Sequence, residues 1–193
     1  KIIFALPTSY RRTIFDTTQE KSFRGEHLIQ PVINSFDKHQ ILGLDLDYTF
    51  RGDLEILSER INDSSMDWIP LENILNTSYD PSKFLHKYLQ IIKEKEFQNL
   101  FVFKNISLWN SLSNFFQSIS FDPFLPNYLQ VIDSLTKFFE KNKPRAIFLP
   151  YETGPLSLAI IIAAKKHNVK TIGLQHGYIY KYNKKGQTKT SVN

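Results

Sequence analysis

The segment RAIFLPYETGPLSLAIIIAAKKHNVKTIGLQHGY, residues 145–178, decides the fold. Its start, 145–149, is predicted to be a strand, and a second strand is predicted at 169–174. Residues 155–167 between them read as a helix whose first residue is proline, which fits a first turn because its missing N–H needs no partner there. A strand, a crossover helix and a strand within about thirty residues form a β-α-β unit with parallel strands.

Two further strands and two helices are expected before this segment. Residues 2–6 are a continuous apolar run, typical of a strand buried on both faces, and a second run lies at 40–44. Apolar residues at helical spacing predict helices over 25–36 and 53–61. With the β-α-β unit, this pattern predicts an α/β fold: a Rossmann-like open parallel sheet with helices on both faces.

The middle of the chain, residues 79–142, has helical apolar spacing over 81–95, 105–119 and 127–141, many aromatic residues, and a break at Pro123 and Pro126. We interpret it as a helical insertion whose phenylalanine stripes form core. The whole chain, 1–193, is then one Rossmann-like domain in which the β-α-β unit at 143–178 carries the site.

Composition excludes several classes of protein. The 193 residues include no cysteine, which excludes a disulfide framework and thiolate-bound zinc and fits a reducing compartment. We find no secretory signal and no run of about 18 apolar residues. The motifs of nucleoside triphosphatases, dinucleotide-dependent dehydrogenases, zinc proteases and serine hydrolases are also missing. We expect a cytoplasmic protein.

Much of the formal charge of +5 comes from the end of the chain, at Lys181, Lys184, Lys185 and Lys189. We favour a solvated tail. The alternative is a basic strip that faces phosphates or an anionic membrane, which would make the protein peripheral at the inner face of the membrane. Nucleic acid is not an expected partner, because no recognition helix or RNA-binding signature is present.

Ligands of open α/β sheets bind outside the carboxyl ends of the strands. This rule selects four loops, at residues 7–12, 45–51, 150–154 and 175–178. The titratable side chains that these loops bring together are Arg11, Arg12, Asp45, Asp47, Glu152 and His176.

His176 is the sharpest candidate. It directly follows an apolar strand, and Gly177 after it lets a ligand come close to the backbone. Imidazole accepts a proton from a sugar hydroxyl near neutral pH, which suits a general base. The alternative is a histidine that only caps the strand through hydrogen bonds.

Glu152 follows the neighbouring strand and is predicted to orient His176 or to bind ligand hydroxyls. The alternative is a purely local role, in which the dipole of the next helix stabilises the carboxylate by about 0.3–1 kcal/mol. Gly154, at the start of that helix, offers a turn that suits a phosphate, although Glu152 beside it opposes a second negative charge.

The remaining candidates carry weaker signals. Asp45 and Asp47 have the spacing of a metal-binding carboxylate pair, but we favour a structural or hydroxyl-binding role. Arg11 and Arg12 are candidates for binding an anionic acceptor; the alternative is that they are solvated or pair with nearby acids.

Parts of the deciding segment resemble a known class of enzyme. Residues 150–155, PYETGP, and 171–177, TIGLQHG, look like bacterial and archaeal surface-polysaccharide glycosyltransferases of the GT-B type. The His-Gly element is also similar to that of glycerophosphate-transferring enzymes of teichoic acid synthesis and, more loosely, to that of sugar-nucleotide 2-epimerases. The resemblance covers 145–178, is weaker over 2–75, and does not extend to the middle of the chain.

The resemblance implies two Rossmann-like domains that face each other across a cleft, without a metal or another cofactor. The N-terminal domain usually binds the acceptor, and the C-terminal domain binds the nucleotide-sugar donor. In the glycerophosphate transferases the histidine of the His-Gly element is thought to be the catalytic base, and His176 occupies the matching position. No donor-binding domain lies within the 193 residues, so we expect this piece alone to be inactive.

One function and two alternatives follow. We expect the acceptor-side half of a glycosyltransferase that moves a sugar from a nucleotide-sugar donor to a surface glycan or lipid-linked acceptor, with His176 and Glu152 as catalytic residues. The alternatives are a sugar-nucleotide epimerase, which needs no acceptor, and a non-catalytic carbohydrate-binding domain. The expected substrate-binding residues are Arg11, Arg12, Asp45, Asp47, Gly154, Gln175 and Gly177.

Overall fold

The computed structural model describes residues 1–16, 20–26, 29–46, 58, 60, 62–121, 124–150, 154–174, 179–182 and 188–191. These residues belong to two compact units. The first consists of Lys1–Leu71, Pro144–Ser157 and Val169–Asn193, and the second of Glu72–Lys143 and Leu158–Asn168.

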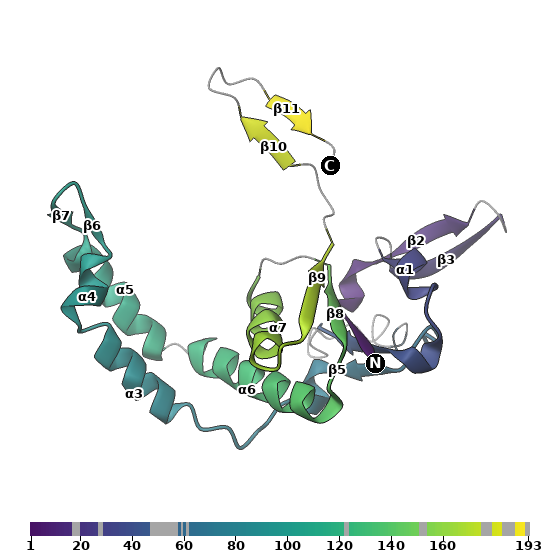
Figure 1. Cartoon of the computed structure of the whole chain (residues 1–193), viewed down its shortest axis with the longest axis horizontal. Helices are drawn as coiled ribbons and strands as arrows, with labels where there is room; N and C mark the ends of the chain where they lie inside the picture. The colour runs from purple at the N-terminus through teal and green to yellow at the C-terminus, as the bar shows by residue number, and fades with distance from the viewer. Residues whose placement is uncertain are drawn as a thin grey trace. The chain divides into compact units, whose positions relative to one another are not determined.

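A parallel sheet forms the centre of the first unit (Figure 1). Its strands are β1 (Ile2–Leu6), β4 (Ile41–Asp45), β5 (Trp68–Pro70), β8 (Ala146–Leu149) and β9 (Lys170–Gly173), in the order β5-β4-β1-β8-β9. Numbered along the chain within this sheet, the order is 3-2-1-4-5, as in the first five strands of a Rossmann sheet. The prediction of a Rossmann-like parallel α/β sheet is confirmed.

The two late strands are neighbours, as the β-α-β pattern predicts. Leu149 pairs with Gly173 in a parallel register, and the N–H of Leu174 donates to the carbonyl of Leu149 at 3.0 Å. The helix between them, α7 (Pro155–Lys166), ends one residue before the predicted end at His167, and Asn168 after it has a φ of 55°, as expected for a C-terminal cap.

Apolar side chains of β1 and β4 pack with α1 (Gln30–Ile33) into the core of the first unit. The ring of Phe4 lies at the middle of this core: it stacks on Phe148 with 4.9 Å between centroids and meets Phe36 edge-on at 6.2 Å. These contacts join β1 to both the early helix and the late strand, so the two parts of the chain share one core.

The predicted helix over 25–36 is wrong in extent. Its first residues belong to β3 (Lys21–Glu26), which pairs antiparallel with β2 (Arg11–Asp16), and only α1 is helical. The cause is a long-range pairing that places Arg11 opposite Glu26 and buries both. The predicted helix over 53–61 lies almost wholly outside the described residues.

Strand β5 is absent from our expectations, because three residues carry too little pattern to be recognised. Trp68 pairs with Gly43 of β4, and Pro70 fits the edge position, where its missing N–H breaks no ladder. A Cβ placed on Gly43 would overlap the indole ring of Trp68. Glycine is therefore required here to let the indole lie across β4.

The second unit includes, within its described residues 72–121, 124–143 and 158–168, most of α7 and four further α-helices: α3 (Ser82–Ile91), α4 (Lys95–Asn99), α5 (Trp109–Phe121) and α6 (Phe124–Asn142). A small hairpin, β6 (Val102–Phe103) and β7 (Ile106–Ser107), separates α4 from α5. The helix predicted over 105–119 is therefore wrong at its start, because Ile106 and Ser107 pair with β6 and the helix begins at Trp109. Four aromatic rings, those of Phe97, Phe101, Trp109 and Phe116, pack against one another below the hairpin, with centroids 5.0–5.8 Å apart.

Short elements complete the described chain. They are the 3-10 turns η1 (Thr8–Tyr10), η2 (Lys38–Gln40) and η4 (Leu71–Ile74), and a late antiparallel pair, β10 (Ile179–Tyr182) and β11 (Thr188–Ser191). Among the helices that the structure describes, none has both the length and the apolar character that crossing a membrane requires.

Candidate functional site

The carboxyl ends of four neighbouring strands meet at one edge of the sheet. Leu6 of β1 pairs with Asp45 of β4, and Leu149 of β8 pairs with Gly173 of β9. The strand order reverses between β1 and β8, and this reversal marks the usual ligand crevice of such sheets. All four loops selected from the sequence therefore leave the sheet at the same edge.

Five of the predicted site residues lie outside the described residues: Asp47, Glu152, Gln175, His176 and Gly177. Their roles stay predictions. What the structure provides is the scaffold before them, since Leu149 and Leu174 are hydrogen-bonded neighbours at the predicted edge. Gly154, which is described, has a φ of 106°, a conformation that favours glycine, and directly precedes α7.

Asp45 is buried at the end of β4, where its carboxylate accepts hydrogen bonds from the loop that follows β1. Thr8 donates twice to its carboxylate, from the backbone N–H to Oδ1 at 3.1 Å and from Oγ1 to Oδ2 at 2.6 Å. Arg60 Nε lies 3.7 Å from Oδ2. These contacts give Asp45 the structural role that we favoured from the sequence, and substrate binding by it stays a prediction.

Arg60 joins several of these groups in the buried interior. Its Nε donates to Thr8 Oγ1 and its Nη1 to Glu26 Oε1, each at 2.7 Å. The guanidinium carbon lies 3.4 Å from the centroid of the Trp68 ring, in cation–π geometry. Only 3% of Arg60 is exposed, and these partners replace part of the water that it loses.

Arg11 and Arg12, adjacent in sequence, have different surroundings. Arg11 is buried and forms ion pairs with Asp63 and, at 3.7 Å, with Glu26. Arg12 is exposed, and its Nη1 donates to the carbonyls of Ser9 and Arg11 at 2.7 and 2.8 Å. Arg11 thus pairs with nearby acids, which was the alternative to acceptor binding; acceptor binding by either arginine stays a prediction.

We call this set of contacts the Arg60 network; its members are Thr8, Arg11, Glu26, Asp45, Arg60, Asp63 and Trp68. Two members, Arg11 and Asp45, are predicted from the sequence because they follow strands. Arg60 is not predicted, because its partner Thr8 is 52 positions away. No signal within a single sequence joins residues at such a separation.

Two acids of the network, Glu26 and Asp63, have pKa values shifted in opposite directions. Burial raises the pKa of Glu26, although Arg60 and Arg11 beside it work in the opposite direction. Burial also opposes the ionisation of Asp63, but hydrogen bonds from Ser65 and the charge of Arg11 outweigh it and lower its pKa. Glu26 is therefore set to take up a proton before Asp63 does as the pH falls.

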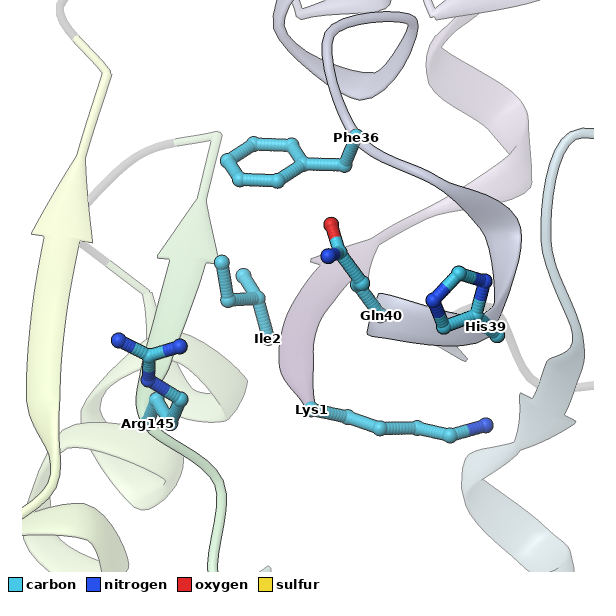
Figure 2. Close-up of a pocket in the computed structure, with 6 residues that line it drawn as sticks. All are labelled: Lys1, Ile2, Phe36, His39, Gln40 and Arg145. Carbon is cyan, nitrogen blue, oxygen red and sulfur yellow. The ribbon is translucent and has the colours of Figure 1, made fainter.

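A hollow of about 200 Å³ lies at the opposite edge of the sheet, where β1, β4 and β8 begin. In Figure 2 the side chains of Ile2 and Gln40 point toward the ring of Phe36, with Arg145 and His39 at the two sides and Lys1 below. Because ligands of parallel sheets bind at the carboxyl ends, this hollow does not contribute to the predicted site.

Within the described residues, no three histidine or acidic side chains are grouped so that they could hold a metal ion. Comparisons of the chain with known protein families, with curated proteins and with solved structures found no match.

Proposed function

We propose that the chain is the acceptor-side, N-terminal half of a GT-B-type glycosyltransferase, which moves a sugar from a nucleotide-sugar donor to a surface glycan or lipid-linked acceptor. The observation that carries this proposal is the parallel pairing of β8 with β9 beside the reversal of strand order. Because the paired strands are parallel, the loops that follow them, which contain Glu152 and His176, start at the same edge of the sheet.

Chain connectivity supports a common site. Glu152 comes three residues after Leu149, and His176 comes two residues after Leu174. An extended chain advances at most about 3.6 Å per residue, which keeps both residues within about 11 Å of the sheet edge. The two loops therefore start as hydrogen-bonded neighbours and have little length over which to separate.

The Arg60 network limits where the acceptor binds. It occupies the edge beyond β1 and β4 with side chains that are buried and paired with one another. The reacting groups are then those of the loops after β8 and β9. Gly154 and the first turn of α7 belong to the same side and supply backbone N–H groups for an anionic part of the acceptor.

In the proposed reaction, His176 accepts the proton of the acceptor hydroxyl while the hydroxyl oxygen attacks the anomeric carbon. The bond from that carbon to the nucleoside diphosphate breaks, and the diphosphate leaves with the electron pair. Glu152 orients the imidazole and stabilises its charge. The donor is held by a second domain of the longer protein, so this chain alone binds acceptor without turnover.

The test uses the protein together with its donor-binding part. His176→Ala should lower the rate of transfer by about 10²–10⁴, the usual contribution of a general base, without a change in circular dichroism. The matched control is His39→Ala, at the opposite edge, which should keep the wild-type rate. A wild-type rate in His176→Ala would remove this residue from the mechanism. If the protein converts a nucleotide sugar into an isomer without any acceptor, the proposed function would be wrong and the protein would be an epimerase.

A further inference from the structure

The hairpin of the second unit exposes apolar side chains. Phe103 and Ile106 are each 65% exposed, and Val102 is 43% exposed. The flanking residues Leu100 and Leu108 are 74% and 45% exposed. Adjacent exposed apolar groups of this kind mark a surface that contacts a protein or a membrane.

The exposed groups lie on both faces of the hairpin. Phe103 pairs with Ile106 and Val102 pairs with Ser107, so Phe103 and Ile106 share one face and Val102 points to the other. A flat protein surface would cover only one of these faces. A lipid layer surrounds a protruding hairpin on all sides.

Charge around the hairpin favours an anionic surface. Residues 98–121 contain no acidic residue, and Lys104 is their one charged residue. Lys104 and Asn105 form the turn, with φ of 48° and 64°. Such turns favour asparagine and glycine, so a lysine places a charge at the tip despite an unfavourable conformation.

The base of the hairpin is fixed. The four aromatic rings below it pack closely, and the N–H of Leu108 donates to the carbonyl of Phe101 at 2.9 Å, which continues the ladder toward α5. In Figure 1 the hairpin lies at the end of α4 and α5. The apolar tip is therefore presented by a packed support and needs little ordering when it binds.

We propose that this hairpin inserts into the headgroup region of an anionic lipid bilayer, with Phe103 and Ile106 among the upper acyl chains. The Lys104 amine, 5.5 Å from the centroid of the Phe103 ring, then reaches back along its stem to the lipid phosphates. This inference does not rest on the proposed glycosyltransferase activity. It uses a different surface from the basic residues at the end of the chain.

The test is flotation of the whole chain with vesicles of phosphatidylcholine, alone or mixed with phosphatidylglycerol. The double variant Phe103→Ser/Ile106→Ser should bind at least about tenfold more weakly, equivalent to 1.4 kcal/mol. Lys104→Gln should bind anionic vesicles about fivefold more weakly than wild type and should bind neutral vesicles as wild type does. The matched control is Phe15→Ser, since Phe15 is 60% exposed on a different hairpin, and it should bind as wild type.

A second measurement does not depend on loss of binding. Phe103→Trp adds an indole at the tip, and lipids with brominated acyl chains should quench the fluorescence that it adds to the wild-type signal. The fluorescence added by Phe15→Trp should stay unquenched. Absence of wild-type binding, or equal binding of the double variant, would overturn the proposal. So would a lipid-free dimer that Phe103→Ser/Ile106→Ser abolishes, because a second copy would then be the occupant.

Discussion

Replacement of Arg60 by methionine tests the Arg60 network most severely. Methionine keeps much of the apolar stem but removes the two 2.7 Å hydrogen bonds to Glu26 and Thr8. Glu26, only 3% exposed, then loses its closest cationic partner. Removing one partner of a buried ion pair costs about 3–5 kcal/mol, a large part of the 5–15 kcal/mol that stabilises a typical domain.

The assay is urea unfolding at neutral pH, followed by circular dichroism, for wild type, Arg60→Met, Glu26→Gln and the double variant. We expect Arg60→Met to lower the free energy of unfolding by about 3–5 kcal/mol. The double variant should recover part of this loss, because the isolated buried acid is gone. Lys137→Met is the control, since its ion pair with Asp133 is largely exposed and should contribute about 0–1 kcal/mol. A loss below 1 kcal/mol in Arg60→Met would refute the reasoning.

Three further predictions concern the same unit. Gly43→Ala should cost about 1–3 kcal/mol in urea unfolding, because the added Cβ displaces Trp68; an unchanged midpoint would contradict this packing. The folded-state pKa of Glu26 is raised, so stability should increase as the pH falls toward it, and Glu26→Gln should abolish this slope. The pKa of Asp63 is lowered, so wild type should lose stability below about pH 4, and Asp63→Asn should lose less, since the lowered pKa values of Asp80 and Asp133 still contribute; parallel curves would refute the assignment.

The parallel sheet could be predicted from the sequence because its signals are local. The run at 145–149, the helix after Pro155 and the run at 169–174 each carry their own periodicity, and their order allows only a parallel connection. The same reasoning located Asp45 at a strand end. Patterns within about ten residues were sufficient for these elements.

The parts that sequence reasoning missed depend on distant partners. The stretch at 25–36 has helical spacing, but Glu26 pairs with Arg11 and Arg60, so its backbone joins a hairpin instead. Strand β5 forms because Trp68 finds space over Gly43. The Arg60 network assembles side chains up to 52 positions apart, which a one-dimensional pattern does not encode.

The proposed reaction requires Glu152 and His176 to face each other beyond β8 and β9. Because the chain has no cysteine, the double variant Glu152→Cys/His176→Cys tests this directly. A disulfide requires Cα atoms about 4.4–6.8 Å apart, close to the separation of neighbouring strands. Mild oxidation should join this pair within one chain and leave Glu152→Cys/His39→Cys reduced. Failure of the first pair to close, or equal closure of both, would contradict a shared site.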